Sequence, residues 1–347
     1  MTVANEFRAA AAGRVLIKDG PYGTMIQCEG LTEADYRGTL TLSHDQKGNN
    51  DLLNLTQPDI VRRIAKQFVS AGADVLATNT FNANRISQAD YGAESLVPDI
   101  NCDAARIIRQ VVDEAAADGK KRWVAGAIGP TNKTLSLSPD VNDPGYREVT
   151  FEEVKSVYRE QIDALVEGGI DFVLIETVFD TLNCKAAIMA ALEAEAALGR
   201  ELPIMISMTL TDLSGRNLSG HTVEGFWASV RHARPLTVGL NCSFGAAQLR
   251  PHLAELARMA ETLVMAYPNA GLPNELGCYD EAAEETAAQV REWLDEGLVN
   301  IVGGCCGTTP AHIAAIAEVA KAARPRTIPG PRNVTLLAGL EPMTLAA

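Results

Sequence analysis

Short apolar runs alternate with longer segments of helical periodicity along most of the chain. Eight of these runs are rich in Val, Ile and Leu and barely alternate with polar residues, which is typical of parallel strands buried on both faces. They lie at 14–19, 73–80, 123–128, 171–177, 203–210, 237–242, 262–268 and 299–304. Eight strand-then-helix units predict an α/β fold, a closed (β/α)8 TIM barrel in a single domain. A doubly wound open sheet is the alternative, although it usually has fewer units.

The segments between the runs carry signals for helix starts. Pro58 is a good first helical residue, with Thr56 as the candidate cap. Thr150 and Glu153 form a capping-box pattern before another helical stripe. We expect residues 1–323 to form the barrel and residues 324–347 to form a linker-like C-terminal tail that begins with a proline-rich stretch.

Composition narrows the possible partners and the cellular setting. The 347 residues include 44 acidic and 30 basic side chains, for a formal net charge of -14. This balance argues against a nucleic-acid or anionic-membrane surface, because both require basic patches. No apolar stretch reaches the length of a membrane-spanning helix, and the first residues do not resemble a signal peptide. We therefore expect a cytoplasmic protein.

Three of the seven cysteines fall where predicted strands end. An odd number of cysteines does not suit a secreted disulfide framework. Cys242 ends the sixth run, and Cys305 and Cys306 end the eighth. Reactive groups of a (β/α)8 barrel lie at these strand ends, so the three thiols are expected at one rim. The other four cysteines are interpreted as structural or incidental: Cys28, Cys102, Cys184 and Cys278.

Three thiolates on one ion would suit zinc and leave the fourth tetrahedral position open for a substrate. Adjacent cysteines reach one ion only if the backbone turns sharply, and Gly303, Gly304 and Gly307 allow such a turn. A substrate thiol at the open position would lose its proton at neutral pH, which favours S-alkylation over hydrolysis. A strained disulfide between neighbouring cysteines and ordinary buried cysteines are the alternatives that spacing leaves open.

Polar residues at other strand ends are further candidates. Asp19 and Glu176 follow apolar runs, where an ionised group is costly unless it has a partner. They either hold a substrate ammonium group or form salt bridges and helix caps. Asn269 is either a turn residue or an oxygen donor near the metal. The five histidines show no HxH or HExxH spacing, and we expect His232, His252 and His312 to face solvent.

Five motifs resemble those of zinc-dependent homocysteine S-methyltransferases. They are Asp-Gly-Pro-Tyr-Gly-Thr at 19–24, Leu-Ile-Glu-Thr at 174–177, Gly-Leu-Asn-Cys at 239–242, Tyr-Pro-Asn-Ala-Gly at 267–271 and Gly-Gly-Cys-Cys-Gly at 303–307. The resemblance covers nearly the whole chain. It looks closest to the homocysteine-binding module of cobalamin-dependent methionine synthase, which Gly-Pro-Thr-Asn at 129–132 and Phe-Asp-Thr-Leu-Asn at 179–183 also resemble.

The resemblance implies a (β/α)8 barrel that transfers a methyl group to L-homocysteine. It implies three zinc ligands that are also the catalytic residues: Cys242, Cys305 and Cys306. Asp19 and Glu176 match positions that bind the homocysteine amino group, helped by the backbone near Gly20. Asn269 matches an asparagine that approaches zinc when substrate is absent. Residues 21–22 stand where related sequences vary.

The full methionine synthase continues into folate-binding, corrinoid-binding and reactivation modules, whereas this sequence stops a few residues after Pro342. The Asp-x-His-x-x-Gly pattern that usually ligates a corrinoid surrounds none of the histidines. We therefore expect one subunit of a split methionine synthase, which receives methyl groups from methylcobalamin on a separate corrinoid- and folate-binding partner protein.

Three other functions stay open at this point. The first is a stand-alone homocysteine methyltransferase that uses betaine or S-methylmethionine. The second is a non-catalytic, zinc-stabilised thiol-binding module. The third is a barrel aldolase or lyase, which would need a Schiff-base lysine or a carboxylate–histidine metal set, and neither stands out in the sequence.

Overall fold

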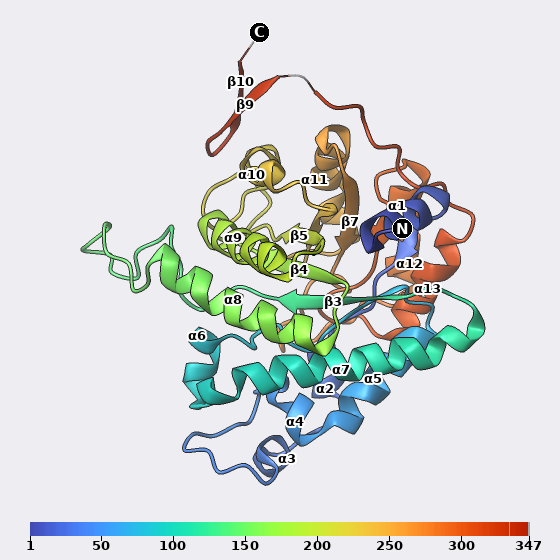
Figure 1. The fold of residues 1–347 in the computed structure, drawn as a ribbon. Helices are drawn as coiled ribbons and strands as arrows, with labels where there is room; N and C mark the ends of the chain where they lie inside the picture. Colours follow the sequence, from blue (N-terminus) through green and yellow to red (C-terminus); the bar gives the residue numbers. More distant parts are fainter. Residues whose placement is uncertain (333, 346–347) are drawn as a thin grey trace.

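Eight parallel strands form the centre of the molecule (Figure 1) in a computed structural model that describes residues 1–332 and 334–345. The strands are β1 (Leu16–Ile17), β2 (Val75–Ala77), β3 (Trp123–Ile128), β4 (Phe172–Val178), β5 (Ile204–Met208), β6 (Thr237–Asn241), β7 (Leu263–Tyr267) and β8 (Ile301–Val302). Their order is β1-β8-β7-β6-β5-β4-β3-β2, and the bridge between Lys18 and Val75 joins the two outer strands. The predicted (β/α)8 barrel is confirmed.

Each predicted run overlaps one observed strand: β3 matches its run, β4 is shifted by one residue, and the other six strands are shorter than their runs. At several carboxyl ends the chain leaves the ladder to form the rim. After β6, for example, Cys242 has a φ of 61° and cannot continue the strand. The chemically interesting residues therefore lie just beyond the strands, on loops that the strands position.

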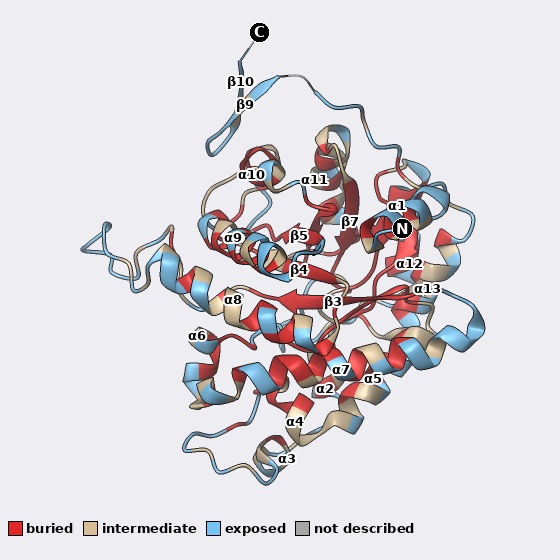
Figure 2. Ribbon diagram, viewed as in Figure 1, coloured by how far each residue is buried: buried red, intermediate tan, exposed pale blue. Residues whose placement is uncertain are grey.

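Helices surround the sheet, and their buried faces point towards the strands (Figure 2). They are α1 (Val3–Gly13), α2 (Tyr22–Gln27), α3 (Glu33–Arg37), α4 (Leu53–Thr56), α5 (Pro58–Ser70), α6 (Arg85–Gln88), α7 (Val97–Ala115), α8 (Phe151–Gly168), α9 (Thr181–Leu198), α10 (Val223–Val230), α11 (Ala246–Met259), α12 (Ala283–Asp295) and α13 (Pro310–Ala320). Short 3-10 turns lie at Asn50–Leu52, Ala89–Tyr91, Glu94–Leu96, Ala116–Asp118 and Arg231–Ala233.

Two predicted helix starts have different outcomes. The capping box of Thr150 and Glu153 is present at the start of α8. Helix α5 does begin at Pro58, but Thr56 is not its cap: Gln57 holds that position without a side-chain hydrogen bond. The Thr56 hydroxyl instead donates to the Leu52 carbonyl, because Thr56 belongs to the preceding helix α4.

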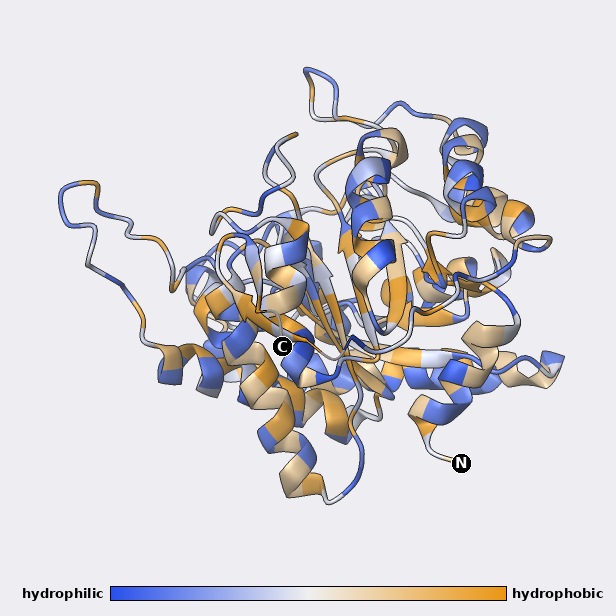
Figure 3. Ribbon diagram, turned by 90° about the horizontal axis from the view of Figure 1, so that it is seen from above, coloured by the Kyte–Doolittle hydropathy of each residue, from blue (hydrophilic) through white to orange (hydrophobic). Residues whose placement is uncertain are grey.

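The core has two layers. One lies between the strands and the surrounding helices, and the other fills the barrel interior. Helix α1 covers the amino-terminal end of the barrel, where the ring of Phe7 meets Trp123 and Phe172 edge-on with centroids 5.0 Å away in each case. Apolar residues accordingly concentrate on the central strands and on the inner faces of the helices (Figure 3). The carboxyl-terminal end of the barrel, by contrast, carries the candidate reactive residues.

The tail is tied to the barrel at two points. Arg326 is buried, and its guanidinium donates to the carbonyls of Ala257, Ala260 and Thr262. Further on, β9 (Thr335–Ala338) and β10 (Pro342–Leu345) form an antiparallel hairpin beside α10 (Figure 1). None of the helices within the described residues combines the length and the apolar character needed to cross a membrane.

Candidate metal-binding site

Three cysteine sulfurs meet at the carboxyl-terminal rim of the barrel. The Sγ atoms of Cys242, Cys305 and Cys306 all lie within 4.8 Å of one another. The Sγ atoms of Cys242 and Cys306 are 3.9 Å apart. All seven cysteines are free, and none of the other four joins this cluster within the described residues. The structure thus brings together the three sequence-predicted cysteines from strands β6 and β8.

The loop after β6 holds an uncommon backbone conformation that turns Cys242 towards β8. Cys242 and Ser243 both have positive φ, 61° and 64°, which is uncommon for residues other than glycine. The Ser243 hydroxyl donates to the Leu210 backbone carbonyl and bonds to the Thr209 hydroxyl, so the segment after β5 holds the turn in place. A backbone that is uncommon and well supported is typical of a functional site.

Asn241 connects the cysteines to two other strands. Its Oδ1 accepts from the Thr177 N–H at 3.1 Å and from the Ser207 hydroxyl at 2.6 Å. Its Nδ2 donates to the Thr177 hydroxyl and points at the Cys305 sulfur, 3.7 Å away. One side chain therefore fixes the ends of β4, β5 and β6 relative to Cys305. Thr177 also has positive φ, 58°, directly after Glu176.

The turn after β8 brings the adjacent pair of cysteines to the same place. The Cys305 N–H donates to the Pro268 carbonyl at 2.7 Å, and the Thr308 N–H donates to the Cys305 carbonyl at 3.0 Å. Gly307 has a φ of 79°, and a Cβ there would lie 2.3 Å from Cβ of Tyr279. Of the three glycines expected to free this turn, Gly307 is the one with positive φ; Gly304 instead provides space beside Thr308.

The three clustered thiols differ in pKa. The Cys305 and Cys306 thiols hydrogen-bond to Cys242 and lower the pKa of Cys242 to about 3. The same contact with Cys242 raises the pKa of Cys306 to about 11 and places the pKa of Cys305 well above its usual value. The cluster thus holds one thiolate among two thiols, and a metal ion would have to displace the remaining protons.

The donor set fits a metal ion. Three sulfurs within 4.8 Å match the soft ligands that zinc and related ions take in proteins. Asn269 follows β7 and contributes to the lowered pKa of Cys242 by hydrogen bonding. Its Oδ1 is buried and has no hydrogen-bond partner among the described residues, so an oxygen beside the sulfurs is unused.

The two candidate carboxylates, Asp19 and Glu176, have different surroundings. Asp19 is fully buried, whereas Glu176 is half-buried. Burial raises the pKa of Glu176, and Lys18 and the Tyr267 hydroxyl lower it in part. Burial also raises the pKa of Asp19 against the opposing effect of Lys18. We infer an ionised Asp19 at neutral pH, because an ammonium and an N–H contact its two oxygens at 2.9 and 2.8 Å.

Lys18 is the residue of this site that the sequence pattern did not single out. Its ammonium is 2.9 Å from Asp19 Oδ1 and 4.6 Å from the centre of the Tyr267 ring. Burial lowers the pKa of Lys18, but the carboxylates of Asp19 and Glu176 raise it by more, so its pKa ends above the usual value. The sequence feature that could have indicated Lys18 is a lysine next to a carboxylate at the end of an apolar strand.

Gly20 and the three histidines have different surroundings. Gly20 lies between Phe68 and Thr308: a Cβ at that position would be 2.7 Å from the Phe68 ring and 3.3 Å from the Thr308 hydroxyl. His232 is exposed and His252 is half-buried, but His312 is buried, so its predicted solvent exposure is wrong. His312 lies in the first turn of α13 and bonds to the Thr309 hydroxyl and the Glu281 carbonyl.

The segments at 129–132 and 179–183 contact each other beside β4. Asn183 donates to the Thr131 hydroxyl at 3.1 Å, and its Oδ1 accepts from the Leu135 N–H at 2.9 Å. Asp180 caps α9 and also accepts from the backbone and hydroxyl of Ser136. These contacts hold the start of the long loop that projects from the barrel before α8 (Figure 1).

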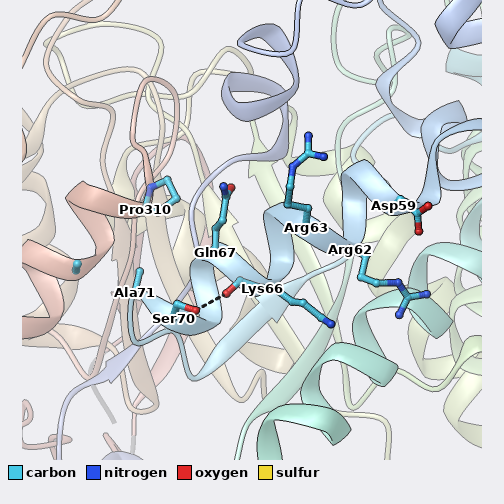
Figure 4. A pocket seen from close by; sticks show the side chains of 9 residues that line it. Asp59, Arg62, Arg63, Lys66, Gln67, Ser70, Ala71 and Pro310 are labelled. Atoms are coloured by element: carbon cyan, nitrogen blue, oxygen red, sulfur yellow. Dashed lines mark hydrogen bonds between the residues drawn. The ribbon is translucent and has the colours of Figure 1, made fainter.

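A separate groove lies on the outer surface between α5 and α13 (Figure 4). It measures about 600 Å³, and Arg62, Arg63 and Lys66 extend from α5 along it. Arg63 pairs with Glu29, and Lys66 pairs with Glu114. None of the three clustered cysteines lines this groove, so it is distinct from the metal-binding site.

The structure therefore defines the class of (β/α)8 barrels that carry, at the carboxyl-terminal rim, a cluster of three thiols able to hold a metal ion. The family model for homocysteine S-methyltransferase matches residues 16–320, and the chain belongs to this family. Membership supports a methyltransferase that acts on homocysteine.

Solved structures share the fold. The homocysteine methyltransferase MmuM from Escherichia coli matches with a TM-score of 0.67 in its metallated form, at 21% identity over 88% of this chain and 96% of that chain. Its oxidized form matches with a TM-score of 0.68, at 21% identity over 88% and 95%. A B12-independent methionine synthase from Shewanella sp. W3-18-1 gives 0.51, at 14% identity over 89% and 97%. At these identities the likeness shows the common barrel.

Proposed function

We propose that this chain methylates the thiol of L-homocysteine to give methionine, with a zinc ion held by Cys242, Cys305 and Cys306. The observation that carries the proposal is the convergence of three sulfurs within 4.8 Å at the catalytic end of the barrel. Family membership supports homocysteine as the substrate. The half-buried Glu176 provides a nearby carboxylate for the amino group of an amino-acid thiol.

Zinc at these sulfurs would supply Lewis acidity, which favours the thiolate form of a substrate thiol at neutral pH. The protein groups around it supply orientation. Glu176 would bind the substrate ammonium, and Asn241 would keep Cys305 in position through its contact at 3.7 Å. In the transfer, the homocysteine sulfur provides the electron pair of the new S–CH3 bond. The bond between the methyl carbon and its donor breaks, the donor keeps that electron pair, and the thiol proton goes to solvent.

We further propose that the donor is methylcobalamin carried by a separate corrinoid- and folate-binding partner protein, with this chain as the homocysteine-activating subunit of a split methionine synthase. The support is the similarity of the segments at 129–132 and 179–183 to the cobalamin-dependent enzyme. These segments contact each other and shape one side of the rim beside β4. Betaine and S-methylmethionine are the competing donors, and we expect the setting to be cytoplasmic.

A donor screen with measured zinc content tests both proposals. Purified chain would be given homocysteine with methylcobalamin, either free or on a corrinoid-binding protein, or with betaine or S-methylmethionine, and methionine would be quantified. We expect about one zinc per chain and product from methylcobalamin only. Efficient turnover with betaine or S-methylmethionine alone would overturn the cobalamin proposal and leave the zinc proposal intact.

The same preparation distinguishes an enzyme from a non-catalytic thiol-binding module. Homocysteine would be titrated into the zinc-loaded chain in weak buffer, and proton release would be measured. An open ligand position predicts a proton released on thiol binding, because the bound thiol becomes a thiolate. Absence of both proton release and turnover with every donor would favour the structural module.

A further inference from the structure

Asp19 already has partners for both of its carboxylate oxygens. The Lys18 ammonium contacts Oδ1 at 2.9 Å, and the Ala77 N–H donates to Oδ2 at 2.8 Å. Lys18 is 5% exposed and Asp19 is 0% exposed, so the ion pair is sealed inside the barrel. A buried ion pair with its hydrogen bonds satisfied is costly to open, because either charge alone would lose its compensation. Asp19 is thus enclosed and already engaged on both oxygens, so a substrate ammonium could reach it only by opening the ion pair.

Glu176 differs from Asp19 in that respect. Its Oε2 accepts from the Tyr267 hydroxyl at 3.1 Å, and its Oε1 has no hydrogen-bond partner among the described residues. Glu176 is half-buried and directly precedes Thr177, which bonds to Asn241 beside the Cys305 sulfur. Of the two carboxylates, Glu176 is therefore the one with an available oxygen on the substrate side.

Tyr267 connects the two halves of this arrangement. The Lys18 ammonium lies 4.6 Å from the centre of its ring, within the range of a cation–π interaction, and its hydroxyl donates to Glu176. The Tyr267 side chain is buried, so its ring is confined between the two charges. The four side chains form a continuous series from the interior of the barrel to its rim: Asp19, Lys18, Tyr267 and Glu176.

We propose that Lys18 is a positioning residue for substrate recognition: it neutralises Asp19 and supports the ring of Tyr267, whose hydroxyl orients Glu176 towards the amino group of the thiol substrate. This inference rests on the proposed homocysteine site. It assigns the ammonium contact to Glu176 alone and gives Asp19 an indirect role. Together, the side chains of Lys18, Asp19 and Glu176 carry one net negative charge, which matches a single substrate ammonium group.

The test compares three thiols on the zinc-loaded chain: homocysteine, 3-mercaptopropylamine, which has only the amino group, and 4-mercaptobutyrate, which has only the carboxylate. Dissociation constants would be measured by calorimetry together with the zinc content. Glu176→Gln should weaken both amino thiols about 30-fold, because a hydrogen bond to a charged group is lost. Its effect on 4-mercaptobutyrate should stay within about twofold.

The double variant Lys18→Met with Asp19→Asn removes the ion pair and conserves the net charge. We expect about fivefold weaker binding of the two amino thiols, and no further weakening when the same pair is removed in Glu176→Gln, because the pair acts through Glu176. Tyr267→Phe removes only the hydroxyl and should reproduce the fivefold loss. The Tyr267→Phe variant therefore tests the inference even if the double variant does not fold. Lys321→Met, at an exposed position directly after α13, is the matched control.

Two results would overturn the inference. Additive losses in the double variant and Glu176→Gln would mean that Asp19 contacts the ammonium directly. Weaker binding of 4-mercaptobutyrate in the double variant would mean that Lys18 binds the substrate carboxylate instead. Failure of the unmodified zinc-loaded chain to bind any of the thiols is a separate result, and it would contradict the proposed function itself.

Discussion

Single residues at the strand ends determine what this barrel can do. Cys242 leaves β6 with a φ of 61° and turns towards the pair after β8, while Asn241 holds the neighbouring strand ends in place. Neither residue acts alone: the thiol pKa of Cys242 is low because Cys305 and Cys306 hydrogen-bond to it. The site is therefore formed by side chains that are more than sixty positions apart in the sequence.

Replacing one sulfur tests the ligand assignment. Cys306→Ala leaves two thiols at the site, so we expect the zinc content to fall to near zero and methyl transfer to be lost, with the barrel still folded. Metal analysis and circular dichroism would measure this. Cys278→Ala, at an exposed cysteine outside the cluster, is the control and should keep its zinc. Activity retained in Cys306→Ala would refute the ligand set.

Asp51 gives a pH-dependent prediction. Burial raises its pKa from 3.8 to about 7, and the Asn82 N–H opposes that shift. The folded state therefore favours the protonated form, and the penalty is absent below about pH 4, grows up to about pH 7 and is constant above it. Asp51→Asn should match the unmodified chain near pH 4 and exceed its free energy of unfolding by roughly 4 kcal/mol at pH 8.

Urea unfolding at several pH values measures this difference. A constant gap between Asp51→Asn and the unmodified chain across the whole range would show that Asp51 stays ionised in the folded protein. Asp59→Asn, at an exposed position on α5, is the comparison variant for the same measurements.

Among the elements, α1 supports the site from the opposite end of the barrel. Phe7 packs edge-on against Trp123 and Phe172 at the starts of β3 and β4. Phe7→Ala should lower the free energy of unfolding by about 3 to 5 kcal/mol, because a large buried ring leaves a cavity. Zinc content should be unchanged, since the cysteines lie at the other rim. Arg8→Ala, a neighbour on α1, is the control for thermal melting, and equal melting temperatures would contradict the role of Phe7.

The strands and the cysteine cluster were predictable from sequence for physical reasons. Parallel strands buried on both faces are nearly all apolar, and their carboxyl ends collect the reactive groups. The role of Lys18 was not predictable, because side chains of adjacent strand residues normally point apart. Lys18 and Asp19 nevertheless form an ion pair at 2.9 Å, although Lys18 still bridges to Val75 in the ladder. The buried His312 was missed because its partner carbonyl comes from the segment before α12, distant in sequence.

At the scale of the whole molecule, the two ends of the barrel have different tasks. Helix α1 closes the amino-terminal end of the barrel. The carboxyl-terminal end carries the three sulfurs, Glu176 and the loops in which residues other than glycine have positive φ. Tail segments anchor beside α10 and through Arg326. A rigid scaffold with reactive groups on its loops suits a reaction that depends on the placement of a thiol.

X-ray absorption at the zinc edge, recorded with and without homocysteine, tests the central claim most directly. The account predicts three sulfur neighbours at about 2.3 Å and one lighter neighbour in the zinc-loaded chain, and four sulfurs once homocysteine is added. Four sulfurs before the addition, or an unchanged spectrum after it, would contradict the account.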